Sequence, residues 1–63
     1  MRFVWIPESM TSPVIYAPQN YNADNTTTNN PWNAMQFETK EACGQWCLNN
    51  PNPRYIPIEH GFA

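Results

Sequence analysis

The sequence predicts an α+β domain in which one helix packs on a small sheet of three or four strands. The prediction rests on short aromatic and β-branched segments near both ends, one helical stretch with a clear start signal, and a long polar segment without periodicity. A chain of 63 residues allows one domain, which buries only about 60% of the surface exposed by its unfolded form. We therefore treat residues 1–63 as a single small domain with a thin core.

The first strands are expected in the N-terminal quarter of the chain. Residues 2–6 alternate between aromatic, aliphatic and polar types, and Pro7 is expected to end this strand. After a connection at residues 8–13, residues 14–16 form a second short strand. Because prolines surround it, this second strand is expected at an edge of the sheet.

A polar loop is expected from residue 19 to residue 33, where Asn and Thr dominate. Their short side chains hydrogen-bond to nearby backbone and compete with helix and strand formation. A loop of about 15 residues exceeds the usual 4–6, and such loops are either mobile or functional. Tyr21 and Trp32 bracket the loop, and they either pin its ends to the body or point outward.

One helix is expected from about residue 39 to residue 48. Thr39 is a good N-cap residue, and Glu41 puts a negative charge in the first turn, where the helix dipole favours it. The apolar residues form one stripe at the helical period: Ala42, Cys43, Trp46 and Cys47. Gly44 costs about 1 kcal/mol relative to Ala, so we expect a compensating feature such as a close backbone approach.

Two further strands flank the helix, at residues 34–37 and 54–60. The order strand, helix, strand predicts that these two strands pair in parallel, with the helix crossing between them in the right-handed sense. Pro57 has no N–H, so the last strand is expected to lie at an edge or to turn its proline nitrogen toward solvent.

The low charge of the chain excludes some partners. It has three Lys and Arg residues against five Asp and Glu residues, for a net charge of −2. Phosphate binding needs several cations on one face, so we expect no nucleic-acid partner. The sequence has no run of about 20 apolar residues and no signal-peptide pattern, which predicts no membrane partner and a cytosolic setting.

Cys43, Cys47 and His60 are the candidate groups for metal binding or catalysis. A structural zinc ion takes four ligands, and only these three are present unless Glu59 joins them. A disulfide is disfavoured because side chains one helical turn apart hold their Cβ atoms about 6 Å apart, against about 3.8 Å in a disulfide. A catalytic thiol needs an imidazole base and a third group that orients it. We therefore predict no enzyme activity, no cofactor, and two thiols that fill the core face of the helix.

The aromatic residues exceed what so thin a core needs, since each can bury roughly 150–250 Å². Five suffice for the core: Phe3, Trp5, Phe37, Trp46 and Tyr55. The other four lie in or beside loops and chain ends: Tyr16, Tyr21, Trp32 and Phe62. Exposed Trp and Tyr residues dominate binding hot spots, so these four are the candidate partner-binding residues. The alternative is that Trp32 and Tyr21 fold back to cover the core.

The C-terminal half carries a resemblance to a known group of proteins. Three segments, with a tryptophan on the intervening helix, resemble many short uncharacterised proteins of tailed bacteriophages. They are Phe37-Glu38-Thr39-Lys40-Glu41-Ala42, Asn49-Asn50-Pro51-Asn52-Pro53 and Tyr55-Ile56-Pro57-Ile58-Glu59-His60-Gly61-Phe62. The resemblance covers about residues 34–63. It implies a setting, the host bacterial cytoplasm or a virion, and it carries over no functional residue.

Together these observations predict a non-catalytic protein-binding module, a phage accessory protein that binds and modulates or inhibits a host protein. The alternative is a structural virion component, a capsid or tail decoration protein, which the uncharged Asn/Thr-rich loop favours. A small zinc-binding domain is the outsider. The expected partner is a host protein or a phage structural protein, and the sequence leaves a homo-oligomer open.

Overall fold

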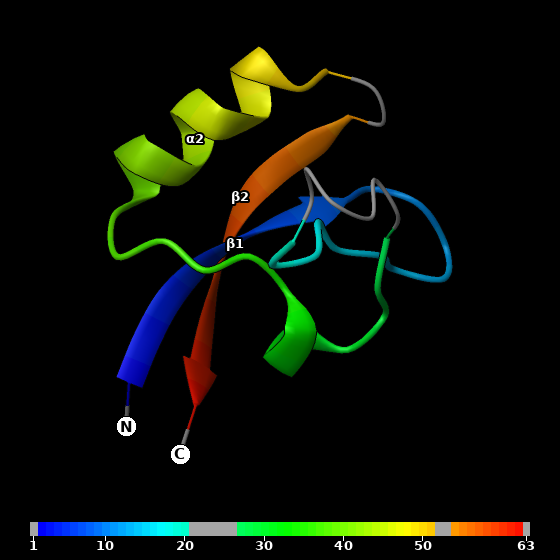
Figure 1. The fold of residues 1–63 in the computed structure, drawn as a ribbon, viewed down its shortest axis with the longest axis horizontal. Coiled ribbons are helices and arrows are strands. Elements are labelled where there is room, and N and C mark those ends of the chain that lie inside the picture. Colours follow the sequence, from blue (N-terminus) through cyan, green and yellow to red (C-terminus); the bar gives the residue numbers. More distant parts are fainter. Residues whose placement is uncertain (1, 21–26, 52–53, 63) are drawn as a thin grey trace.

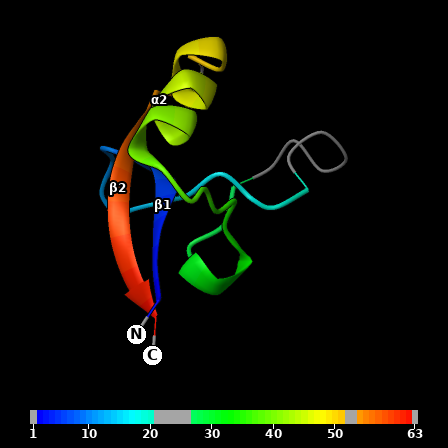
Figure 2. The ribbon, with the colours of Figure 1, turned by 90° about the vertical axis from the view of Figure 1, so that its left-hand side faces the viewer.

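A computed structural model describes residues 2–20, 27–51 and 54–62. Strand β1 (Arg2–Ser9) and strand β2 (Tyr55–Phe62) form a two-stranded sheet, helix α2 (Lys40–Asn49) packs against it, and a 3-10 turn, η1 (Pro31–Asn33), lies in the polar segment. Figure 1 shows the two described chain ends side by side at one end of the sheet, because Arg2 pairs with Phe62. Figure 2 shows α2 lying along one side of the strands.

The α+β class is confirmed, but the predicted sheet is wrong in its number of strands and in its pairing. The described residues form two strands, and β2 runs antiparallel to β1 rather than parallel to residues 34–37. Phe37 instead bonds to the opposite edge of β1, with Trp5 N to Phe37 O at 2.7 Å and Phe37 N to Trp5 O at 2.9 Å. Residues 14–16 contribute only isolated bridges, from Tyr16 to Glu8 and from Tyr16 to Thr28. These segments are too short to extend beyond single bridges, so β1 holds the centre.

Pro7 does not end the first strand, which continues to Ser9. The N–H and C=O of Trp5 point to Phe37 and therefore away from β2. Because this direction alternates along an antiparallel pair, Pro7 and Pro57, which stand opposite each other, both turn their nitrogens away from the bonds that join β1 to β2. Neither proline removes a bond between the strands, and the expectation that the Pro57 nitrogen faces an outer edge is confirmed.

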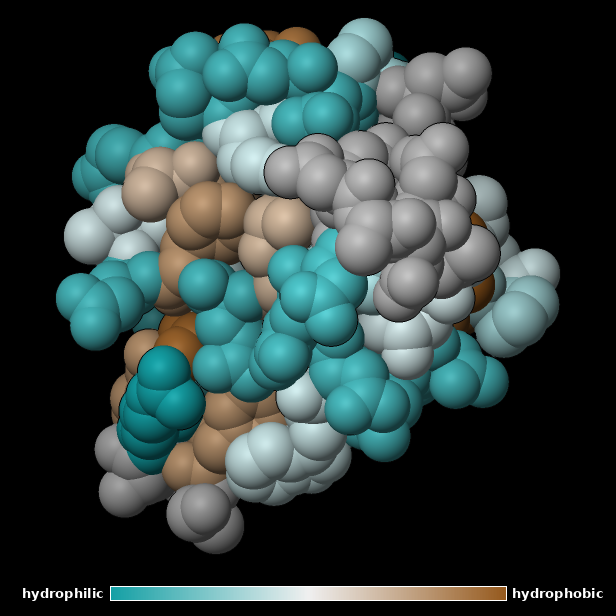
Figure 3. Space-filling model, viewed as in Figure 1, coloured by the Kyte–Doolittle hydropathy of each residue, from teal (hydrophilic) through white to brown (hydrophobic). Residues whose placement is uncertain are grey.

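The alternation of side chains divides the core into two small clusters, one on each face of the ribbon. Val4, Ile6 and Phe62 lie on one face and pack with Ala34 and the half-buried Tyr16. The residues of the other cluster and those packed against it are Ala17, Cys43, Cys47, Tyr55, Trp5, Met35, Phe37 and Trp46. Figure 3 shows hydrophobic side chains in a band on the left half of this face, interrupted and bordered by hydrophilic ones.

The predicted helix is confirmed, with bounds Lys40–Asn49. Thr39 Oγ1 accepts a hydrogen bond from Ala42 N at 3.1 Å, as an N-cap should. Cys43 and Cys47 are buried, whereas Ala42 is exposed. The predicted stripe is wrong at Ala42 because each residue advances the helix by about 100°, which carries this position off the face that Cys43 and Cys47 share.

The helix is held at both ends by further contacts. Near its start, Lys40 Nζ lies 5.8 Å from the centroid of the Trp5 ring, and near its end the ring centroids of Trp46 and Tyr55 are 5.6 Å apart. The Asn50 side chain donates to Trp46 O at 2.9 Å, which satisfies a carbonyl of the last turn. The helix is therefore in contact with β1 near its start and with β2 near its end.

The polar segment is attached to the body where the structure describes it. Tyr16 N donates to Thr28 O at 2.7 Å, Thr28 N donates back to Tyr16 O at 3.0 Å, and Gln19 N donates to Asn33 O at 3.1 Å. Thus residues 19–33 are not one structureless loop but include a bridge and the turn η1. Tyr21 lies outside the described residues.

Replacing Gly44 with Ala is expected to raise the free energy of unfolding by about 1 kcal/mol, through the difference in helix propensity. The close backbone approach expected at Gly44 is wrong, since a Cβ there meets only Pro57 Cγ, at 3.9 Å, an ordinary contact. Its φ is not positive either. Urea denaturation followed by tryptophan fluorescence measures the change. Gln45→Ala, at the next and exposed position, is the control and gains no more than about 0.5 kcal/mol; a loss of stability in Gly44→Ala would contradict the interpretation.

Candidate functional site

The first candidate surface, which we call the aromatic face, is centred on Trp32. The turn η1 presents this residue because Asn30 Oδ1 accepts a hydrogen bond from Trp32 N at 3.0 Å and Pro31 occupies the first turn. The Trp32 ring is 59% exposed, and its centroid lies 4.2 Å from that of Phe62, with a tilt of 35°. The ring is therefore exposed to solvent and supported from below.

A polar group borders the same face. The Tyr16 ring meets His60 edge-on, with centroids 5.5 Å apart, and His60 Nε2 lies 3.1 Å from Glu8 Oε1. Burial, and then the neighbouring Glu8 carboxylate, raise the pKa of the Tyr16 hydroxyl. Tyr16 is thus a neutral phenol at physiological pH, beside an imidazole and a carboxylate that approach each other along the ribbon.

The structure brings together three of the four predicted contact residues. Trp32, Phe62 and Tyr16 lie on the face of the ribbon opposite the helix, whereas Tyr21 is outside the described residues. Phe62 is only 8% exposed, so it supports Trp32 rather than presenting its own ring. Sequence reasoning considered His60 only as a metal ligand or base, and it did not place His60 or Glu8 at this face. The alternation of β2 could have indicated His60, which is two residues before Phe62 and therefore on the same face.

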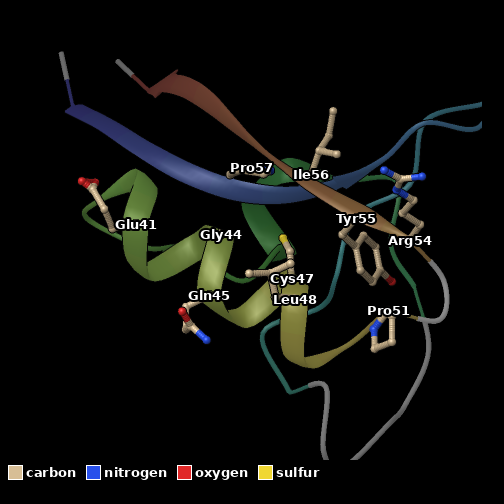
Figure 4. Close-up of a pocket in the computed structure, with 10 residues that line it drawn as sticks. All are labelled: Glu41, Gly44, Gln45, Cys47, Leu48, Pro51, Arg54, Tyr55, Ile56 and Pro57. Atoms are coloured by element: carbon tan, nitrogen blue, oxygen red, sulfur yellow. The ribbon is translucent and has the colours of Figure 1, made fainter.

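The second candidate surface is a groove between α2 and β2, of about 620 Å³ and mostly apolar (Figure 4). Its lining residues are Glu41, Gly44, Gln45, Cys47, Leu48, Pro51, Arg54, Tyr55, Ile56 and Pro57. Glu41 and Arg54 lie at opposite ends of it (Figure 4). Leu48 is 77% exposed at its side. Sequence reasoning missed this groove because its members form no motif, and Leu48 was the one visible signal, an apolar residue outside the helical stripe.

The two cysteines do not form a reactive site. Both are buried and neither is in a disulfide. Burial, with the neighbouring Cys47, raises the pKa of the Cys43 thiol from 9.0 to about 12, and burial also raises the pKa of Cys47. A nucleophile or metal ligand needs the thiolate, and this environment disfavours it. The cysteines therefore act as small apolar side chains in the core.

The structure does not bring together the proposed zinc ligands. Cys43 and Cys47 pack on one face of the ribbon, whereas His60 contacts Glu8 and Tyr16 on the other. Within the described ranges, no three His, Cys, Asp or Glu residues are grouped as a metal site requires. The same separation keeps His60 away from either thiol as a general base.

Comparisons with protein-family models, with curated proteins and with solved structures found no match to this chain. In the part of the chain that the structure describes, no helix has the length and apolar character needed to cross a bilayer.

We expect the free energy of unfolding to fall as the pH rises from about 9 toward 12. In this window the unfolded chain ionises Cys43, whereas the native chain, with its raised pKa of about 12, keeps the proton. The native state then binds more protons than the unfolded state, so stability decreases with pH by up to about 1.4 kcal/mol per pH unit for this thiol. Urea denaturation from pH 8 to 10.5 measures the slope.

Cys43→Ala is the matched variant for this measurement. It removes the thiol, so the slope should become smaller even though the cavity lowers stability at every pH. The raised pKa of Tyr16 adds a loss of the same sign, but only above about pH 10. An unchanged slope between pH 8.5 and 10 in Cys43→Ala would contradict the assignment.

Proposed function

We propose that the chain is a non-catalytic protein-binding module whose contact surface is the aromatic face centred on Trp32. In the setting implied by the resemblance, it is a phage accessory protein that binds a host protein in the bacterial cytoplasm and modulates or inhibits it. One observation carries the proposal: Trp32 is 59% exposed although a tryptophan is costly to leave in water.

The support beneath Trp32 makes this ring suited to binding. Stacking on Phe62 and the Asn30 cap restrict the side chain and its backbone before any partner arrives. A restricted side chain loses less conformational entropy on association, so more of its buried area appears as affinity. Tryptophans held in this way are typical interface hot spots.

The surroundings of Trp32 match the anatomy of a small interface. The apolar centre of Trp32 and Phe62 is bordered by Tyr16, His60 and Glu8, which supply hydrogen-bonding groups at the margin. With a net charge of only −2, long-range electrostatic steering contributes little to association. Recognition then depends on shape and on the burial of aromatic surface.

The alternative of a virion component rests on the polar segment, because uncharged, Asn/Thr-rich extended segments are frequent in capsid and tail contacts. The bonds of Tyr16 to Thr28 and of Gln19 to Asn33 tie the described parts of this segment to the body. A fixed surface of this kind supports a module that binds in solution over an arm that orders only in an assembled particle. Mass spectrometry of purified particles tests the alternative directly.

Trp32→Ala is expected to abolish capture of the partner, because truncating a central hot-spot tryptophan commonly costs 2 kcal/mol or more of binding energy, about a 30-fold loss. The same change should lower folding stability by only about 0.5–1.5 kcal/mol, the value of the lost contact with Phe62. Tagged wild-type and variant proteins are compared by affinity capture from bacterial host extract. The captured protein is then purified and titrated.

Met10→Ala is the matched control. Met10 is also a large apolar residue and is 72% exposed, but it lies in the connection that follows β1. The variant should retain the partner at wild-type affinity. Two results would reject the proposal: a partner that binds Trp32→Ala as well as the wild type, or a loss of stability large enough to assign Trp32 to the core.

A further inference from the structure

The outer edge of β2 has hydrogen-bonding capacity that the described chain does not use. β2 pairs with β1 along one edge only. Along an antiparallel pair, the backbone groups of successive residues point alternately toward the partner strand and away from it. Glu59 and Gly61, like Pro57, point away from β1, so they direct their N–H and C=O groups to the outer edge. These outward groups have no backbone partner among the described residues. The edge therefore offers two donors and, counting the Pro57 carbonyl, three acceptors in strand geometry.

The groove lies beside the first part of β2, at residues 55–57, and the outward groups of Glu59 and Gly61 continue from it along the same strand. Its lining comes from α2, β2 and the connection between them, and includes no residue of β1 or of the segments that bond to the other edge of β1. On the helix, Glu41, Gly44 and Leu48 share one flank, which is turned away from the flank of the buried Cys43. The groove therefore opens outward from β2, with the helix as one wall (Figure 4).

We propose that this groove binds an extended peptide segment of another protein, which adds a strand to the outer edge of β2 and inserts an apolar side chain between α2 and β2. Strand addition takes its affinity from backbone hydrogen bonds and its specificity from pockets that receive alternate side chains. An edge strand next to an apolar groove supplies both. This site is separate from the aromatic face and does not depend on Trp32.

The charges of the groove define the peptide further. Arg54 lies at one end and Glu41 at the other, and neither makes an ion pair with the residues that the structure describes. A segment with a carboxylate next to Arg54 complements this arrangement. A second copy of the chain fits less well, because symmetric antiparallel pairing centred on Glu59 sets two carboxylates against each other.

A displayed library of random octapeptides tests the proposal. It is selected on the wild-type protein and on two variants, Leu48→Lys and Asn49→Lys, which add the same charge at neighbouring exposed helix positions. Only Leu48 lines the groove. Wild type and Asn49→Lys should enrich peptides with apolar residues at alternate positions and an acidic residue at one end. The synthetic consensus peptide should bind Leu48→Lys about tenfold more weakly, because the apolar wall is lost.

A charge exchange tests the orientation of the peptide. The variant Arg54→Glu should bind the consensus peptide several-fold more weakly than the wild type does. It should prefer the same peptide with Lys in place of the acidic residue. Trp32→Ala should bind the consensus peptide as the wild type does. A result that rejects peptide binding at the groove can therefore be distinguished from one that rejects partner binding at the aromatic face.

Amide hydrogen exchange tests the mode of binding. Without peptide, the Glu59 and Gly61 amides should exchange quickly and the Ile58 amide, which faces β1, slowly; with peptide, all three should be protected. The proposal is overturned if no enrichment depends on Leu48, or if bound peptide protects none of the outward amides, as a helical occupant would. Protection that grows with protein concentration in the absence of peptide would overturn it in favour of a second copy.

Discussion

The antiparallel pairing of β1 with β2 is the interaction on which the rest of the structure depends. It joins the two ends of the chain in a register that runs from Arg2 opposite Phe62 to Ser9 opposite Tyr55. In this register Pro7 and Pro57 stand opposite each other with their nitrogens outside the bonds between the strands. A shift of one strand by one residue would turn the nitrogen of one of the two prolines toward the partner strand, where a donor is needed, and would exchange the two faces of that strand. The prolines therefore help to specify the register.

The register also determines which residues can act together. One face presents Val4, Ile6 and Phe62 to the segment that carries Trp32, and the other face receives the helix through Trp5 and Tyr55. Because each cluster is small, few large side chains lie fully inside, and tryptophan and leucine side chains remain at the surface. The exposed Trp32 and Leu48 thus mark opposite sides of one thin sheet.

Local features were predictable from the sequence, and long-range ones were not. The helix follows from the Thr39 cap and the Asn50 end, which are decided within a few residues. The pairing partner of a short strand depends on contacts across the whole chain. The predicted pairing of residues 34–37 with β2 is therefore wrong, and Phe37 bonds to Trp5 instead. In the candidate sites, the Asn and Pro neighbours of Trp32 indicated a loop position, but its stacking on Phe62 depends on the register. The groove depends on the angle between α2 and β2, which no motif records.

The two surfaces lie largely on opposite faces of the thin sheet. Along β2, His60 and Phe62 contribute side chains to the aromatic face, whereas Tyr55 and Pro57 contribute theirs to the groove. By this alternation the groove residues Tyr55 and Pro57 lie on the face opposite His60 and Phe62, whereas Ile56, which also lines the groove, shares the face of His60. If both proposals hold, the chain binds two different protein segments, one on each side of a single pair of strands.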